Sequence, residues 1–375
     1  MKASSNNCIL LKNLFIIFLF SCFATYAQIG GENDFYIRGA ANFGGLIVQN
    51  YTATTTYKFI DGFDLNYIKP SSGKKLWQHE NNFPEHGFGL TCFDLNNPKV
   101  FGNVYASYIF CDIPLSKKEK PFRLYMRLAA GLAYAPVHFN ATKNPYNDML
   151  SAPLDGYGNL KWFFRWNLSK QLCWDLGLSF SHISDGSSNL PNLGLNIMTV
   201  NTGLIYKFIN PVKNIITQVD SGSQRRTKYE VLLWAGIGKV QEYVFGNKYQ
   251  AQSYSAAFYS NIRNTHKIGA GIDMFYNGGN IELLKEEGIN LSSNFQNIQT
   301  GIKVSYVYNL GRLSIPIEMG AYVISKYKEA TPFYERIGVR YYFKNNIVAL
   351  VTLRIYWIQA YNLEFGIGYR IGVKS

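Results

Sequence analysis

The stretch Phe122–Tyr134, FRLYMRLAAGLAY, decides the fold because its residues alternate strictly in character. One face carries arginine, tyrosine, alanine and glycine, and the other is apolar throughout: Phe122, Leu124, Met126, Leu128, Ala130, Leu132 and Tyr134. A period of two is that of an extended strand whose faces meet different surroundings. Its 13 residues exceed the usual sheet strand and suit the roughly 9 to 11 residues with which a tilted strand crosses a bilayer.

The same alternation recurs along the chain in about 16 segments. They begin near Phe35, Lys58, Gly87, Val100, Phe122, Tyr157, Leu172, Leu195, Tyr229, Tyr254, Lys267, Thr300, Leu313, Arg336, Ile347 and Tyr361. Only a closed barrel lets such strands pair all their backbone groups in lipid. We therefore predict an all-β fold, a transmembrane antiparallel β-barrel of outer-membrane type with about 14 strands, in the range 12–16 because neighbouring segments merge easily.

Two other architectures stay open. A secreted β-sandwich shows similar alternation, although its strands are shorter. The polar stretch 210–226 also divides the chain into two parts of about eight segments, which end alike in Gly203–Phe208, GLIYKF, and Gly366–Ile371, GIGYRI. The first prediction is one continuous barrel over 28–375. It consists of a first part, 28–209, which contains the candidate site, a connecting loop, 210–226, and a barrel extension, 227–375. Two small barrels are the alternative.

Residues 1–27 read as a secretory signal peptide. Lys2 and Lys12 precede the apolar run Leu14–Ala24, and small residues precede a cut before Gln28. A lipoprotein signal ending at Cys22 is disfavoured by the bulky Phe20. The mature chain holds no apolar run of 18 residues, so helical membrane spans are excluded. These features predict export to the outer membrane of a Gram-negative cell.

The composition agrees with a barrel whose two surfaces differ. The chain is 47% hydrophobic and 16% aromatic but only 16% charged, with 33 glycines, which excludes disorder and collagen. The net charge is +13, and removal of two lysines with the signal peptide leaves +11. This charge suits the phosphates of a membrane lipid, and we expect no nucleic-acid partner. The five histidines show no zinc-ligand spacing, so we expect no metal and no cofactor.

The segment Ser181–Asn196, SHISDGSSNLPNLGLN, places polar side chains on the apolar row at a strand end. His182 and Ser184 continue the row of Trp174, Leu176, Leu178 and Phe180, and Asn196 begins the apolar row of the next strand. Three polar side chains are therefore expected to project outward together, where the lipid-facing surface meets the head groups.

This arrangement predicts an esterase. His182, two residues before Ser184 on one face, is placed to take the hydroxyl proton, and Asn196 across the hairpin is placed to orient the imidazole. The backbone N–H groups of Asp185 and Gly186 are candidates for an oxyanion hole. A substrate reached from the membrane side is a lipid ester. The competing interpretation is a hairpin loop rich in turn-forming residues, with Pro191–Gly194 as the turn.

The string HISDGSSNLPNLGLN, between an alternating strand and one ending GLIYKF, resembles the lipid A 3-O-deacylase (PagL-like) or acyloxyacyl hydrolase family of outer-membrane barrels. That family carries His-x-Ser-Asn, then Pro-Asn-x-Gly and an acidic residue. The resemblance implies that His182 is the general base and Ser184 the nucleophile. It also implies action from the outer barrel surface on lipid A of lipopolysaccharide, with release of a fatty acyl chain. It is specific over Trp174–Phe208 and weaker over Phe35–Phe208.

Two positions depart from the family pattern. Asp185 stands where the family has an asparagine, and Asn196 stands where it has the glutamate that orients the histidine. Asparagine orients an imidazole but does not stabilise imidazolium by charge, so we expect a slower enzyme or an inactive one. The remaining alternative is a porin-like or structural barrel with inward Arg123, Arg127, Glu364 and Arg370. A homodimer stays open.

Overall fold

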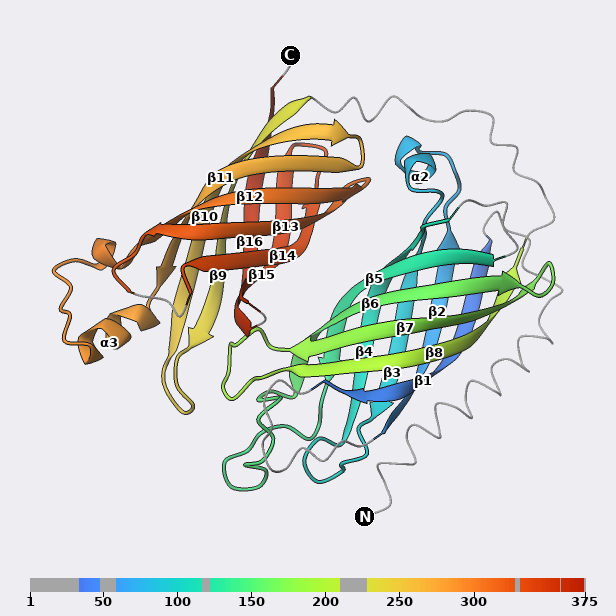
Figure 1. The fold of residues 1–375 in the computed structure, drawn as a ribbon, viewed down its shortest axis with the longest axis horizontal. Coiled ribbons are helices and arrows are strands. Elements are labelled where there is room, and N and C mark those ends of the chain that lie inside the picture. The colour runs from blue at the N-terminus through green and yellow to red at the C-terminus, as the bar shows by residue number, and fades with distance from the viewer. Residues whose placement is uncertain are drawn as a thin grey trace. The chain divides into compact units, whose positions relative to one another are not determined.

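A computed structural model describes residues 34–47, 59–116, 122–209, 228–327, 331–357 and 359–373. The predicted signal peptide, 1–27, and the predicted connecting loop, 210–226, lie outside these residues. The described residues form two closed antiparallel barrels (Figure 1).

The first barrel closes because its last strand pairs with its first, from Phe35↔Phe208 to Leu46↔Ile197. Its strands are β1 (Phe35–Leu46), β2 (Ile60–Pro70), β3 (Glu85–Asp94), β4 (Asn103–Pro114), β5 (Phe122–Tyr134), β6 (Leu154–Asn167), β7 (Leu172–Ser184) and β8 (Leu195–Phe208). Apart from this closing pair, the neighbours in this barrel are consecutive strands of the chain, so the topology is up-and-down.

The second barrel closes in the same way, through pairing of β16 with β9. Its strands are β9 (Tyr229–Gln241), β10 (Lys248–Arg263), β11 (His266–Asn277), β12 (Gln299–Leu310), β13 (Leu313–Ile324), β14 (Phe333–Tyr342), β15 (Ile347–Tyr356) and β16 (Gln359–Val373). Two barrels of eight strands thus replace the single barrel of about 14 strands that the sequence predicts. Alternation specifies strands and faces but not which strands close a ring.

Among the residues that the structure describes, three short helical segments join strands: α2 (Leu76–Glu80), α3 (Gly279–Glu286) and the 3-10 helix η1 (Asn294–Asn297). None of the helices in the described ranges has the length and apolar character needed to cross a membrane.

Buried ion pairs fill the interior of the first barrel. Arg38 donates to both carboxylate oxygens of Asp175 at 2.7 Å, and Arg127 donates to those of Asp112 at 2.6 and 2.8 Å. Arg165 donates to Glu85 at 2.7 Å. A barrel of eight strands has an interior just wide enough for side chains to fill it. These pairs therefore occupy the lumen. Two of them, Arg38 with Asp175 and Arg165 with Glu85, also join strands that are not consecutive in the sequence.

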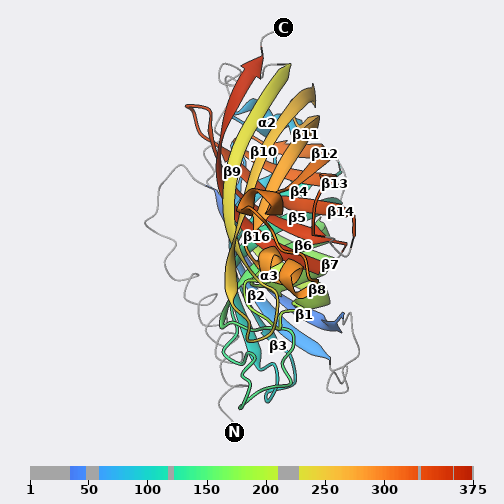
Figure 2. The same cartoon turned by 90° about the vertical axis from the view of Figure 1, so that its left-hand side faces the viewer.

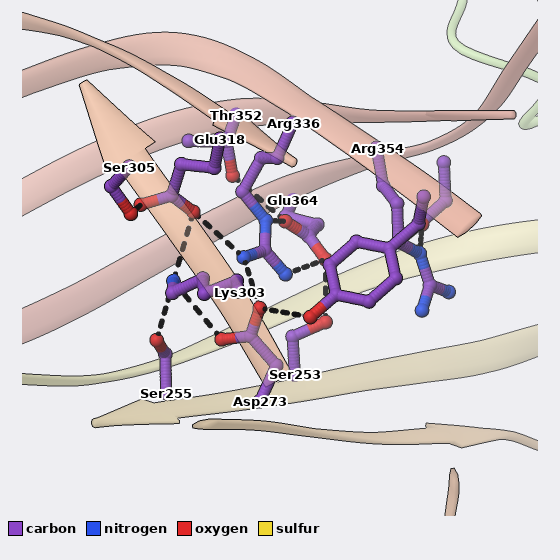
Figure 3. A network of polar contacts seen from close by, with 12 residues as sticks. Ser253, Ser255, Asp273, Lys303, Ser305, Glu318, Arg336, Thr352, Arg354 and Glu364 are labelled. Carbon is purple, nitrogen blue, oxygen red and sulfur yellow. Dashed lines mark hydrogen bonds and ion pairs between the residues drawn. The ribbon is translucent and has the colours of Figure 1, made fainter. Parts of the chain in front are cut away.

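The second barrel holds a larger network, drawn in Figure 3. Glu318 accepts from Lys303, Arg336 and Arg340 at 2.9, 3.0 and 2.6 Å. Arg336 continues to Glu364 at 2.8 Å, which also accepts from Thr352 at 2.8 Å. In Figure 3, Lys303, Glu318 and Arg336 point toward one another. All three are buried, so charged side chains fill this part of the barrel interior.

The outward faces are apolar, as the alternation predicts. Exposed Leu176 and Leu178 alternate with buried Asp175 and Ser179 along β7. Aromatic rings gather on the first barrel at the strand ends joined by the β6–β7 turn, where Trp166 stacks on Trp174 with centroids 4.7 Å apart. Phe35 stacks on Phe208 at 4.6 Å at the same end. An apolar band bordered by aromatic residues is typical of a barrel in a membrane.

Candidate active site on the first barrel

Ile183 fixes the direction of its neighbours at the end of β7. Its side chain is fully buried inside the barrel, in a core cluster with Leu195, Ile197 and Tyr157. Adjacent residues of a strand point to opposite faces. His182 and Ser184 are therefore held on the outward row, and Ser184 is the last residue of the strand.

Asn196 lies directly opposite His182 on β8 in the sheet register. His182 Nδ1 and Asn196 Oδ1 are 2.7 Å apart. An amide oxygen only accepts, so Nδ1 carries the proton and donates it. The lone pair of the neutral ring is consequently on Nε2, the atom that a general base uses.

Gly194 packs against the other edge of the imidazole. A Cβ built on Gly194 would lie 2.7 Å from His182 Cε1, and the residue has φ +73°. The backbone N–H groups of Leu193 and Gly194 donate to Asp148 and Met149 at 3.1 and 3.0 Å, which anchors this turn to the β5–β6 connection. The ring thus lies between an amide partner and a position that only glycine fits.

Asp185 and Gly186 follow Ser184 immediately, where β7 has ended. Ser151 Oγ donates to Asp185 Oδ2 at 3.3 Å, so the carboxylate is held by the β5–β6 connection. Gly186 has φ +67°, the left-handed region in which glycine is favoured. The structure thus leaves the backbone at both positions outside the strand ladder, and their role as oxyanion donors remains a prediction.

Two glycines beside the outward row are residues that the sequence reasoning missed. Gly156 lies opposite Ser184 and Gly158 opposite His182 on β6. A Cβ built on Gly158 meets nothing within 4 Å, and one built on Gly156 meets only Ser184 O at 3.2 Å. The outward surface is therefore hollow next to His182 and Ser184. The signal was present in the sequence, since both glycines interrupt the apolar row Leu154, Leu160, Trp162.

No metal site accompanies these residues within the ranges that the structure describes, because no group of three or more His, Cys, Asp or Glu side chains is arranged to hold an ion. This strand end offers a hydroxyl, an oriented imidazole and backbone N–H groups. That set suits acyl transfer.

Comparison with known families agrees with this chemistry. Residues 61–204 match the family model described as lipid A 3-O-deacylase (PagL), and residues 227–373 match the acyloxyacyl hydrolase C-terminal domain. The chain belongs to the PagL-like family. The two matches cover most of the chain, one for each barrel, and the PagL match contains His182, Ser184 and Asn196.

Other comparisons add little to this assignment. No curated protein matches the chain. Among solved structures, Neisserial surface protein A matches with 12% identity and a TM-score of 0.32 over 47% of this chain and all of its own. The translocator domain of the autotransporter NalP from Neisseria meningitidis matches with 10% identity and a TM-score of 0.21 over 98% of each chain. A Rhodopseudomonas blastica porin mutant matches with 7% identity and a TM-score of 0.18, over 90% of this chain and all of its own.

Proposed function

We propose that this PagL-like protein is an outer-membrane serine esterase that removes an ester-linked acyl chain from lipid A. Ser184 is the nucleophile, His182 the general base, and Asn196 the residue that orients the base. The observation that carries the proposal is the hydrogen bond of 2.7 Å between His182 Nδ1 and Asn196 Oδ1 on the outward row that ends in Ser184.

The depth of Ser184 supports a substrate in the membrane. Ser184 lies ten residues after Trp174 on β7, which is about 33 Å along a strand. With the usual tilt of roughly 40° this is about 25 Å along the bilayer normal, the height of the apolar band of such barrels. With Trp174 in the aromatic border at one interface, Ser184 reaches the other, where ester groups of lipids lie.

The steps follow from the protonation state of His182. Ser184 Oγ attacks the acyl carbonyl carbon while His182 Nε2 takes the hydroxyl proton, and Asp185 and Gly186 N–H groups stabilise the oxyanion. Collapse breaks the bond to the sugar oxygen, which leaves with the proton held on Nε2. Water, deprotonated by the same nitrogen, then attacks the acyl-enzyme, releases the fatty acid and restores Ser184. No cofactor takes part.

The open space over Gly156 and Gly158 allows the acyl carbonyl to reach Ser184 along the outward surface. Leu132 and Leu154, 55% and 58% exposed, border this gap on β5 and β6. An acyl chain lying over the gap exchanges lipid contacts for contacts with these side chains. The substrate thus stays in an apolar surface layer while its ester reaches the polar strand end.

Covalent trapping tests the nucleophile. We expect a fluorophosphonate to add one phosphonyl group to the purified protein at Ser184, detected by intact mass and peptide mapping. Ser184→Ala should take up none and His182→Ala should react far more slowly, because Ser184 then lacks its base. Equal labelling of Ser184→Ala would contradict the proposal.

The alternative of a porin-like barrel predicts ion conduction. The buried pairs of Arg38 with Asp175 and Arg127 with Asp112 favour a filled lumen in the first barrel, and Glu318 with its cations favours the same in the second. We expect no stable conductance steps when the protein inserts into planar bilayers. Regular steps in proportion to the inserted protein would favour the pore.

A further inference from the structure

The outward wall of the second barrel carries an apolar groove of about 670 Å³. It extends over five adjacent strands, from β15, which contributes Ile347 at its start, through β16, β9 and β10 to β11. The last four of these strands lie side by side in Figure 2. Its outward lining includes Ala235, Ala256, Tyr254, Ile272, Ile367 and Tyr369. The volume lies within the roughly 300–1,000 Å³ of small-ligand sites.

Two alanines create the floor of this groove. Ala256 pairs with Leu233 on one side and Ile272 on the other, and Ala235 pairs with Ile367 and Tyr254. Large outward side chains thus surround two small ones in adjacent rows of the sheet. The depression follows from this difference in size, so filling the floor should remove it.

The medium around this wall indicates the occupant. Leu233, Ile272 and Ile367 are 45%, 54% and 63% exposed on the outward face, which in a membrane-spanning barrel contacts acyl chains. A flexible chain that fills the groove gains dispersion contacts that a flat wall does not offer. An apolar surface of a second copy of the chain would gain similar contacts in the groove. The polar residues near the groove distinguish a lipid from a second copy.

These polar residues lie at one end of the groove. Lys239 is exposed on the same outward row as Ala235, four residues further along β9, or about 13 Å. Within the part of the chain that the structure describes, no hydrogen bond or ion pair of Lys239 is found. Gln250 lies opposite Lys239, and Gln252 accepts from the Tyr254 hydroxyl at 2.9 Å. One cation and neutral amides complement one negative phosphodiester.

We propose that this groove binds one acyl chain of a glycerophospholipid with an anionic phosphodiester, whose phosphate contacts Lys239. Ala235 and Ala256 form the seat of the chain, and Gln250 and Gln252 lie beside the phosphate. The site is on the second barrel and uses neither His182 nor Ser184. It is therefore a lipid-binding function additional to the esterase.

Native mass spectrometry of the purified full-length protein in detergent tests the site, with phosphatidylglycerol as the added lipid. We expect one phosphatidylglycerol per chain to bind tightly to the wild type. Ala256→Phe fills the floor and should lower occupancy at least tenfold. Ala321→Phe adds the same ring to the outward row of β13, away from the groove, and should bind as the wild type does.

A second variant separates the head group from the chain. Lys239→Gln should weaken phosphatidylglycerol about tenfold, because it removes a charged hydrogen bond, and should leave the binding of a neutral diacylglycerol unchanged. Equal occupancy in the wild type and Ala256→Phe would overturn the proposal. So would preferential retention of lipid A, or a lipid-free dimer that Ala256→Phe dissociates.

Discussion

At the scale of single residues, the candidate site depends on how His182 is held. Asn196 binds Nδ1 on one edge, and Gly194 leaves room for the other edge. Asparagine fixes the tautomer but adds no charge, so the imidazolium formed during the reaction is stabilised less than by a carboxylate. The expected consequence is a site with correct geometry and modest electrostatic assistance.

We therefore expect Asn196→Glu to raise the rate of the proposed esterase reaction. A hydrogen bond to a charged partner stabilises by about 1.5–3 kcal/mol against about 0.5–1.5 for a neutral one, and about 1.4 kcal/mol corresponds to tenfold in rate. We expect about a tenfold increase in turnover of a lipid ester in detergent micelles. A decrease with the barrel intact by circular dichroism would show that the amide itself is required.

We expect Gly194→Ala to lower activity strongly and stability moderately, because φ +73° strains an alanine. The new Cβ would lie 2.7 Å from His182 Cε1 and push the ring from its position, and a misplacement of about 1 Å costs roughly 100-fold in rate. Gly288→Ala is the matched control, because Gly288 has φ +78° with nothing within 4 Å. If both variants lost activity to the same extent, the loss would be due to backbone strain and not to displacement of the His182 imidazole.

The side-chain directions at the site were predictable from the sequence, but the space around them was not. A period of two leaves only two faces, so the apolar row through Leu176 and Leu178 assigns His182 and Ser184 to it. The gap at Gly158 depends on the register of β6 against β7, which alternation does not determine. The bond from Ser151 to Asp185 likewise depends on the path of a loop.

Among the strands, the proposed path of the acyl group to Ser184 runs over the outward face of β6. Gly158→Val places a side chain where a Cβ meets nothing within 4 Å, so the sheet accommodates it. We expect at least a tenfold loss of activity on lipid substrates at unchanged stability, since the valine occupies the proposed path of the acyl group. Ala321→Val is the control, because it enlarges a small outward side chain on β13 of the second barrel. Full activity of Gly158→Val would contradict this path.

The strands themselves were well predicted, because each is long and periodic. The predicted starts near Phe122, Leu172, Leu195 and Tyr229 coincide with those of β5, β7, β8 and β9. The start of β10 is the least accurate, Lys248 instead of Tyr254, since the outward row there begins with polar residues. A strand whose first outward residues are polar is not distinguishable from a loop by alternation alone.

At the scale of the whole molecule, the all-β barrel fold is confirmed, but two rings replace one. Closure after β8 is supported by contacts that the sequence does not reveal: Arg38 on β1 pairs with Asp175 on β7 and with Asn201 on β8 at 3.2 Å. Each lumen contains such a network of its own. The number of strands in each barrel thus depends on which inward-facing side chains pair with one another. Alternation shows only that these side chains are polar.

The network of the second barrel makes a prediction about stability. Glu318→Gln removes the carboxylate shared by Lys303, Arg336 and Arg340, which leaves buried cations short of a partner. Breaking such a pair costs about 3–5 kcal/mol. We expect the free energy of unfolding of this barrel in urea to fall by that amount, and Glu287→Gln, at an exposed loop position, to leave it unchanged. Equal stability of both variants would show that the network contributes little.

The proposed function of the whole protein requires that Ser184 and His182 deacylate lipid A. Mass spectrometry of lipid A from Gram-negative cells that produce the wild type, Ser184→Ala or His182→Ala tests it most directly, with insertion of each barrel checked in isolated outer membranes. We expect lipid A lacking one ester-linked acyl chain with the wild type and unmodified lipid A with both variants. Identical acylation patterns in all three, with the proteins correctly inserted, would contradict it.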